Sequence, residues 1–355
     1  MAKNSIQGTM EQGPAIIDIG RFLADPTSAE ALEDCKNLVK TLQETSCLVI
    51  KSPKVNEEQN SRFLDMMEQY YEQPTEALMK DVHPEWSYQL GATPEFTEKP
   101  RDHADVIKAL KPQYAAHAPR GADPKWRFFW RIGDRPSDTA YPELNCPPVI
   151  PAKFPHWQDV MDSWGSLMLS SIETVSEMIA TGYGLPVDSI TKMMKNGPHL
   201  LAPTGSDLKR FGDLDQIFAG FHYDFNLLTI HGKSRYPGLY IWLRDGTRVL
   251  VKVPPGCLLL QAGKQLEWIT GGDIMAGFHE VVVTKETQAA VEKAKEEGRS
   301  LWRISSTLFG HIASDTTLNI LPPFSNEENL KKYPAILAGK QSEEELQMIN
   351  LQQKS

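Results

Sequence analysis

The chain has 355 residues, of which 41% are hydrophobic and 23% are charged, as in folded proteins of one large domain or two small ones. Its formal net charge of −9 argues against nucleic-acid binding, because phosphate contacts need clustered Lys and Arg. No apolar stretch is long enough to span a membrane, and the first residues lack the apolar core of a signal peptide. We therefore expect a cytoplasmic protein with no membrane association. Its four scattered cysteines should be reduced thiols: Cys35, Cys47, Cys146 and Cys257.

The first 80 residues predict a mixture of strands and helices. Residues 1–13 are polar and are expected to be flexible. Short apolar runs at Ala15–Ile17 and Cys47–Ile50 favour strands. Ser28 can cap one helix and Asn56 can open a second. The apolar face of the first helix is expected to consist of Leu32, Cys35, Val39 and Leu42.

The periodicity is lost between residues 83 and 156, where Pro, Gly, His and charged residues dominate. A long irregular region in a compact domain is often functional. Its one aromatic run, Trp126–Arg131, could line a substrate pocket or pack as a lid on the core. A long helix follows, with apolar residues at three- and four-residue steps from Val160 to Ile179, and Gly182 is expected to end it.

Short β-rich segments separated by turn residues dominate the sequence after Pro198. The expected strands are Phe221–Ile230, Gly238–Leu243, Thr247–Val253, Cys257–Gln261, Glu280–Thr284 and Leu301–Phe309. A charged helix is expected at Lys285–Glu297. Helices followed by antiparallel strands predict an α+β, mostly β fold, namely a jelly roll with flanking helices packed on the sheet.

We divide the chain into an N-terminal helical and mixed region, residues 14–200, and a jelly-roll core with the functional site, residues 201–324. Residues 325–355 are polar with a weak helical period and are expected to form a helical tail. These regions should form one globular unit.

Three residues form a candidate metal site. His222 and Asp224 stand two apart at the start of a β-rich run, so their side chains should point to the same side of a strand. His279 opens a later strand and could supply a third ligand. Two histidines and one carboxylate leave open coordination positions, which suits non-haem iron(II). The alternative is hydrogen-bonded core histidines, because a lone His-x-Asp is a weak motif.

Two further histidine–acid pairs occur, His83-Pro-Glu85 and His103-Ala-Asp105. Both lie in polar sequence without a strand to fix their geometry, so we expect neither to bind metal.

Arg303 and Ser305 form a second candidate site, with two polar side chains on one strand face. Arg303 precedes an apolar run, and a buried Arg needs a carboxylate partner in bidentate geometry. That partner could be a bound carboxylate, with the hydroxyl of Ser305 completing the clamp, or an internal Asp or Glu.

In these motifs the chain resembles the isopenicillin N synthase-like family of iron(II), 2-oxoglutarate-dependent dioxygenases, as an outlying branch. The block His222–Ile230 is similar to the family's His-Thr-Asp-x-Gly-x-Leu-Thr-Leu, and Arg303–Ser305 is similar to its Arg-x-Ser. The shorter matches, in the family's order, are Pro14–Asp18, Thr45–Ile50, Pro237–Leu239, Pro255–Gly256, Gly263, Leu266 and Thr270–Gly272.

The resemblance implies a double-stranded β-helix that binds Fe(2+) through His222, Asp224 and His279, and 2-oxoglutarate through Arg303 and Ser305. It implies a dioxygenase that uses O2 to oxidise a small-molecule substrate and releases succinate and CO2, with ascorbate as a candidate reductant. We expect a monomer or a weak homo-oligomer.

The chain departs from the family where Asn-Tyr-Tyr-Pro normally precedes the His-x-Asp block, because Leu200–Pro203 stands there. The family's Asn and Tyr help to hold the co-substrate. Their loss leaves open an iron oxidase of the same fold that does not use 2-oxoglutarate. A non-catalytic metal- or ligand-binding jelly roll and a zinc hydrolase are two further candidates.

Overall fold

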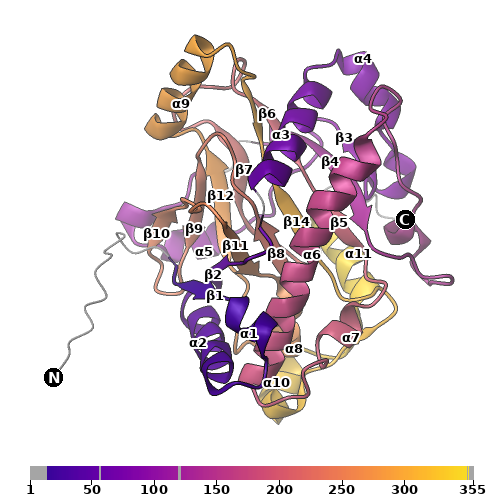
Figure 1. Ribbon diagram of the computed structural model, residues 1–355, viewed down its shortest axis with the longest axis vertical. Coiled ribbons are helices and arrows are strands. Elements are labelled where there is room, and N and C mark those ends of the chain that lie inside the picture. The colour runs from indigo at the N-terminus through magenta and orange to yellow at the C-terminus, as the bar shows by residue number, and fades with distance from the viewer. Residues whose placement is uncertain (1–13, 56, 119–120, 350, 352–355) are drawn as a thin grey trace.

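Two β-sheets face each other in the computed structural model, and helices cover the outer face of the larger sheet (Figure 1). The structure describes residues 14–55, 57–118, 121–349 and 351. The expected flexibility of residues 1–13 and the helix start expected at Asn56 lie outside these residues. The arrangement is the jelly roll, or double-stranded β-helix, that the order of predicted elements favours.

The major sheet has ten strands in the order β1-β2-β11-β8-β14-β5-β4-β6-β13, with β3 paired to β4. Its neighbouring strands pair antiparallel, except β1 with β2, which are parallel. Its strands are β1 Ile16–Asp18, β2 Cys47–Lys51, β3 Gly91–Thr93, β4 Trp126–Ile132, β5 His199–Leu201, β6 Thr204–Asp207, β8 Leu228–His231, β11 Cys257–Ala262, β13 Trp302–Ile304 and β14 Thr307–Gly310.

The minor sheet has the order β10-β9-β12-β7, and every pair in it is antiparallel. Its strands are β7 Ile217–Tyr223, β9 Leu239–Trp242, β10 Arg248–Leu250 and β12 Phe278–Val282. A separate two-stranded ribbon pairs β15 Thr317–Leu318 with β16 Ile336–Leu337.

The helices lie mostly in the N-terminal half of the chain and at its C-terminal end. They are α1 Gly20–Ala24, α2 Ala29–Thr45, α3 Glu57–Tyr71, α4 Thr75–Leu78, α5 Ala104–Ala109, α6 Trp157–Gly182, α7 Thr191–Met194, α8 Lys264–Ile269, α9 Lys285–Glu296, α10 Glu327–Lys332 and α11 Ala338–Met348.

Helix α6 is the longest helix of the helical layer and runs along the major sheet beside α2 and α3 (Figure 1). Its apolar positions recur at helical spacing, and Trp157, Trp164 and Ile172 among them are fully buried against the sheet. The helix ends at Gly182, as the sequence predicts. Burying each such side chain contributes about 1.5–3 kcal/mol, so this helix anchors the sheet from one face.

Helix α2 begins where its capping residue predicts. The hydroxyl of Ser28 accepts a hydrogen bond from the amide of Ala31, which satisfies one free donor of the first turn. Cys35 and Leu42 are buried, but Leu32 is 39% exposed, so its assignment to the apolar face is wrong. Leu32 stands in the first turn, before the helix reaches the sheet.

The region from residue 83 to residue 156 is less irregular than the sequence suggests. It supplies β3, α5 and β4, and all seven residues of β4 are buried. Trp126, Phe128 and Trp130 alternate into the helical side of the core, whereas Arg127 and Phe129 face the opposite way, into a cavity between the sheets. The aromatic run is therefore an inner strand and not a lid.

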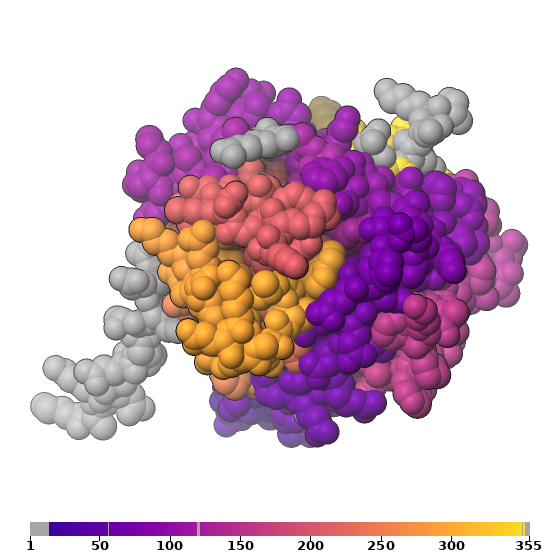
Figure 2. Space-filling view, turned by 90° about the horizontal axis from the view of Figure 1, so that it is seen from above, coloured from indigo at the N-terminus to yellow at the C-terminus, as the bar shows by residue number. Residues whose placement is uncertain are grey.

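The two halves of the chain interlock. The expected boundary between residues 200 and 201 falls inside β5, and strands from both sides of it alternate in the major sheet. On the face seen in Figure 2, the orange segment that contains α9 lies against the violet N-terminal segment. Arg235 bridges the halves there by ion pairs to Asp65 and Glu68 of α3, at 2.6 and 2.7 Å.

Cys35, Cys47, Cys146 and Cys257 are all buried and free, as expected. Among the residues that the structure describes, no helix has the length and apolar character needed to cross a bilayer.

A buried histidine couples the stability of the fold to pH. The Nε2 atom of His199 donates to the Met194 carbonyl, and its Nδ1 atom accepts from the amide of His311, each at 3.1 Å. Burial, followed by the charge of Arg131, lowers the pKa of His199 to about 4. An unfolded histidine titrates near 6.5, so below that pH the unfolded chain gains a proton that the native state resists.

We predict that acid destabilises the protein through this residue. The contribution of His199 is fully present above pH ~6.5 and is lost as the pH falls toward about 4, on the order of 2 kcal/mol between pH 7 and pH 5. Urea unfolding at both pH values should show a smaller pH dependence for His199→Gln than for wild type. His156→Gln, at an exposed position before α6, is the control. Equal pH dependence in all three proteins would contradict the prediction.

Candidate metal centre

Two neighbouring strands of the minor sheet bring the candidate ligands together. Strands β7 and β12 pair antiparallel with His222 directly opposite His279, and the two imidazole centroids are 4.2 Å apart. Asp224 lies just beyond the end of β7, in the segment that carries the chain from the minor to the major sheet. The sequence predicts one strand from Phe221 to Ile230, which is wrong, because β7 and β8 belong to different sheets.

The three side chains converge on one point. The Nε2 atom of His222 is 3.7 Å from Oδ1 of Asp224, and the Nε2 atom of His279 is 3.8 Å from Oδ2 of Asp224. These separations are too long for hydrogen bonds. All three candidate ligand atoms lie within 4.8 Å of one another. In the described part of the chain, this is the one group of three or more His, Cys, Asp or Glu residues with a metal-binding arrangement.

Hydrogen bonds hold two of the three candidate ligands, His222 and Asp224, in the forms that bind metal. The Nδ1 atom of His222 lies 2.6 Å from the Gly220 carbonyl, which can only accept, so Nδ1 carries the proton and the Nε2 lone pair is free. Asp224 Oδ2 accepts from the hydroxyl of Thr229 at 2.7 Å. Burial and the proximity of His279 hold the pKa of His222 below its usual value. Burial opposes ionisation of Asp224, but the two histidines outweigh it and lower its pKa.

A third histidine, His231, lies beside this group and was not singled out by the sequence. Its ring centroid is 6.1 Å from that of His279. Its nitrogens contact the Thr307 hydroxyl at 3.0 Å and Oε1 of Gln261 at 3.1 Å. Both ring nitrogens are therefore engaged, and His231 lines the same cavity as the three candidate ligands and Arg303.

Arg303 lines the same cavity as the three candidate ligands and is 5% exposed. Its Nε atom has one long contact, 3.4 Å, to the carbonyl of Pro237. No carboxylate within the described ranges forms an ion pair with it. Burial lowers its pKa to about 10, so the guanidinium remains charged at neutral pH. The internal Asp or Glu partner considered from the sequence is absent from these residues.

Ser305 follows β13 and lies across from Thr204 of β6. Its Oγ atom accepts from the amide of Thr204 at 2.9 Å and from the Thr204 hydroxyl at 2.6 Å. Its own proton has a long contact, 3.4 Å, with the carbonyl of Ala202. Both Ser305 and Thr204 line the cavity.

These features agree with what the comparisons show. Residues 208–312, which include all five of the predicted site residues, match the family model described as the 2OG-Fe(II) oxygenase superfamily. This part of the chain therefore resembles the superfamily in sequence. The match covers β7, β12 and β13, the three strands that carry or adjoin the site.

Known superfamily proteins resemble the chain at low identity. Kihadalactone A synthase LFS from Citrus sinensis is 24% identical over 198 residues, which are 52% of this chain and 53% of that protein. The match thus spans about half the length of this relative. Two solved structures share the fold over most of the chain. A 2OG-Fe(II) oxygenase family protein from Caulobacter crescentus has a TM-score of 0.69, 20% identity and coverage of 94% and 97% of the two chains. A full-length Neurospora crassa protein solved in complex with alpha-KG has a TM-score of 0.72, 17% identity and coverage of 94% and 95%.

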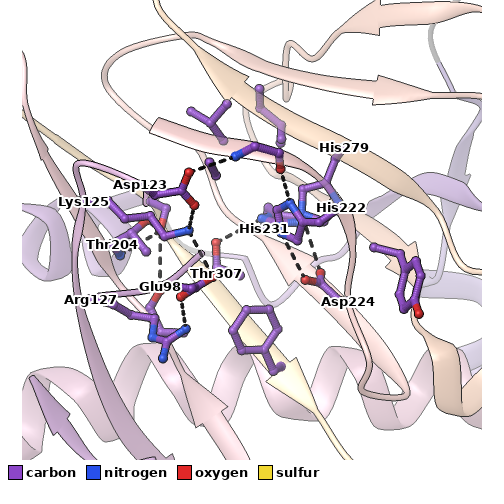
Figure 3. Close-up of a pocket in the computed structure, with 18 of the residues that line it drawn as sticks. Glu98, Asp123, Lys125, Arg127, Thr204, His222, Asp224, His231, His279 and Thr307 are labelled. Atoms are coloured by element: carbon purple, nitrogen blue, oxygen red, sulfur yellow. Dashed lines mark hydrogen bonds and ion pairs between the residues drawn. The ribbon is translucent and has the colours of Figure 1, made fainter. Parts of the chain in front are cut away.

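The cavity has a volume of about 350 Å³ and a charged wall that the sequence did not reveal. Figure 3 shows this wall on one side and His222, Asp224 and His279 on the other, with Thr307 and His231 between them. The wall consists of Glu98, Asp123, Lys125 and Arg127. Glu98 and Asp123 lie in segments without regular structure, so no periodicity marks them.

His103 also belongs to the cavity, which corrects the expectation of a polar loop. It is 8% exposed and packs edge-on against Phe278, with ring centroids 5.1 Å apart. The other pair behaves as expected, because Nδ1 of His83 simply contacts Glu85 at 2.8 Å on the surface. Neither pair joins the candidate metal group.

The C-terminal helix closes part of the cavity. Glu345 of α11 forms an ion pair with Arg101 at 2.6 Å, and Arg101 also donates to the Tyr223 hydroxyl at 2.5 Å. Leu346 and Leu351 line the cavity beside them. The strand that carries His222 is thereby tied to the last helix of the chain.

We predict that His222→Ala, Asp224→Ala and His279→Ala each abolish tight iron(II) binding. Loss of an outer-shell partner already costs about 10–100-fold in metal affinity, and loss of a ligand should cost at least as much. Anaerobic dialysis against iron(II), followed by metal analysis and circular dichroism, separates lost binding from lost fold. His83→Ala is the matched control. Stoichiometric iron in any of the three variants would rule out that residue as a ligand.

Proposed function

We propose that the chain is an iron(II)- and 2-oxoglutarate-dependent dioxygenase that oxidises a small organic molecule with release of succinate and CO2. One observation carries the proposal. Arg303 is a buried cation without a carboxylate partner among the described residues, in the same cavity as the three candidate ligands. A buried charge requires compensation, and a dicarboxylate that also reaches the metal would provide it.

His222, Asp224 and His279 would hold the iron, and the donor set fits it. Two neutral imidazoles and one carboxylate occupy one side of a metal and leave positions open for co-substrate and O2. With iron(II), 2-oxoglutarate and O2 bound, such a centre oxidises a C–H bond as 2-oxoglutarate loses CO2. Ascorbate could serve as the reductant that keeps the iron in its active state.

The protein's own residues would bind and orient the reactants. The Gly220 carbonyl fixes the His222 ring, and the hydroxyl of Thr229 fixes the Asp224 carboxylate. Arg303 and Ser305 would hold the distal carboxylate of 2-oxoglutarate by charge-assisted and neutral hydrogen bonds. The buried position of Arg303 excludes water, which strengthens these interactions.

The fold likeness to the Neurospora crassa protein supports the proposal, because that protein was solved with alpha-KG bound. The rival is an iron oxidase of the same fold that does not use 2-oxoglutarate. It is favoured by the apolar side chains of Leu200 and Ala202, which line the cavity near the place where the family carries Asn and Tyr. A non-catalytic jelly roll is the third candidate.

We further propose that the protein acts in the cytoplasm, as a monomer or weak homo-oligomer without nucleic-acid or membrane partners. Four buried free thiols support a reducing compartment.

We predict that the purified protein, loaded with iron(II), releases succinate from 2-oxoglutarate in air. Slow uncoupled turnover without substrate should be detectable by mass spectrometry of succinate, and a panel of small acids, amides and phenolics should include compounds that raise the rate. His222→Ala is the control for iron in solution. Substrate oxidation without succinate would favour the oxidase, and no turnover with any compound would favour the non-catalytic protein.

We predict that Arg303→Lys weakens 2-oxoglutarate binding about ten- to a hundred-fold and leaves iron binding unchanged. Lys cannot reproduce the two parallel hydrogen bonds of a guanidinium, and a charge-assisted hydrogen bond contributes about 1.5–3 kcal/mol. Ser305→Ala should cost about 1 kcal/mol, as for a neutral hydrogen bond. Anaerobic titration of 2-oxoglutarate into the iron(II) protein, followed by its absorption band, measures both. Unchanged affinity in Arg303→Lys would place the clamp elsewhere.

A further inference from the structure

The charged wall of the cavity consists of four ionisable groups, and within the described residues their ion pairs are formed with one another. The Nζ atom of Lys125 is 2.8 Å from Oδ2 of Asp123 and 3.2 Å from Oε1 of Glu98. The Nη1 atom of Arg127 is 2.5 Å from Oε2 of Glu98. The positive charges of Lys125 and Arg127 equal in number the carboxylates of Asp123 and Glu98. The wall therefore has no net charge that would attract a charged substrate.

Burying four charges is costly, and a buried ion pair is weak evidence of stabilisation. Burial alone would raise the pKa of Glu98, but Lys125 and Arg127 outweigh it and bring that pKa to about 2. Burial likewise opposes the charge of Lys125, yet Asp123 and Glu98 raise its pKa. Glu98 and Lys125 therefore remain ionised, whereas burial raises the pKa of the Asp123 carboxyl. The place of these groups opposite the candidate metal ligands suggests a role in binding (Figure 3).

The hydrogen bonds within the charged wall leave some donor and acceptor positions free for a ligand. The ammonium of Lys125 has three protons, and two are directed to Asp123 and Glu98. Each carboxylate oxygen of Glu98 accepts one hydrogen bond, from Lys125 or Arg127, and can accept a second. Lys125 thus has one unused donor proton and Glu98 has unused acceptor positions. The Nζ atom of Lys125 and Oε1 of Glu98 are 3.2 Å apart.

Arg127 does not add a free cationic site. Its Nε and Nη2 atoms are buried and have no hydrogen-bond partner in the part of the chain that the structure describes. Its Cζ atom lies 4.0 Å from the centroid of Phe129, which covers the guanidinium. Of the four side chains Glu98 has the largest exposed fraction, 17%, against 7% for Lys125. A ligand in the cavity therefore reaches the acceptor oxygens of Glu98 more easily than the donor nitrogen of Lys125.

The cavity walls around Lys125 and Glu98 are apolar and include Leu200, Ala202, Phe129 and Phe309. A ligand must therefore be apolar over most of its surface and polar at one end.

We infer that the substrate is an uncharged molecule with an N–H donor beside a carbonyl, as in an amide or a lactam, and that this group docks on Glu98 and Lys125. The N–H donates to Glu98 and the carbonyl accepts from Lys125. A carboxylate would approach the exposed oxygens of Glu98 with like charge in a desolvated site, which opposes binding. An acceptor without an N–H would fill none of the remaining acceptor positions of the Glu98 carboxylate, which already accepts from Lys125 and Arg127.

This inference rests on the proposed function only for the claim that the docked molecule is oxidised; binding requires no turnover. The test uses three probes of nearly equal shape: benzamide carries the N–H and the carbonyl, acetophenone carries the carbonyl alone, and benzoate carries the negative charge. Calorimetric titration measures each dissociation constant with the full chain, both without metal and with iron(II) and 2-oxoglutarate under argon.

Wild type should bind benzamide about ten- to a hundred-fold more tightly than acetophenone, the factor expected for a hydrogen bond to a charged group. Benzoate should bind more weakly than benzamide. In Glu98→Gln the preference for benzamide over benzoate should shrink at least tenfold, because the repelling charge is gone. Glu95→Gln is the matched control, since Glu95 pairs with Arg210 outside the cavity at 2.9 Å and its loss should change no probe affinity.

Benzoate binding as tight as benzamide in wild type would overturn the inference, and so would equal affinity for benzamide and acetophenone. Failure of benzamide to bind at millimolar concentration also counts against it. The wild-type comparison needs no variant, so a Glu98→Gln protein that does not fold leaves the inference testable. If succinate release fails while benzamide binds with the expected preference, the proposed activity is wrong and the binding site stands.

Discussion

The antiparallel pairing of β7 with β12 is the constraint on which the site depends. It places His222 opposite His279, and the end of β7 at Tyr223 frees the chain to cross between the sheets at Asp224. The carboxylate can then turn toward the two imidazoles, where Thr229 of the major sheet holds it. A metal bound there would join the two sheets at the point where the chain passes from one to the other.

The cavity beside the candidate metal ligands contains two kinds of buried charge, one unpaired and one paired within the protein. Arg303 has no carboxylate partner in the described residues, and under the proposed function a bound carboxylate would compensate its charge. Glu98, Asp123, Lys125 and Arg127 compensate one another within the protein and present only polarity. An anionic co-substrate and a neutral substrate can therefore occupy one cavity without competing for the same cation.

The sequence predicted the parts of the site that lie within short motifs. His222 and Asp224 are two residues apart and Arg303 and Ser305 are two residues apart, so their proximity follows from the backbone alone. It could not predict the charged wall, because Glu98 and Arg127 meet across 29 residues of irregular chain. Strand β4 was hidden for another reason: all of its residues are buried, and Phe129 interrupts the alternation of apolar residues with Arg127 and Arg131 that would mark a strand. Leu32 shows the opposite error, an apolar residue in the right period but beyond the edge of the core.

The strand order of the major sheet also determines how the chain can be divided. Strand β11 lies between β2 and β8, β14 pairs with β5, and the β6–β13 ribbon joins the sheet only through β4. A fragment that began after residue 201 would expose the backbone donors and acceptors of three strands that are paired in the intact chain. Such open edges recruit other chains, so the fragment would aggregate rather than fold. The strands that carry the candidate site therefore cannot be transferred to another protein by themselves. A chimaera made from two relatives must take β2, β4 and β5 from the same parent as their partners β11, β6 and β14.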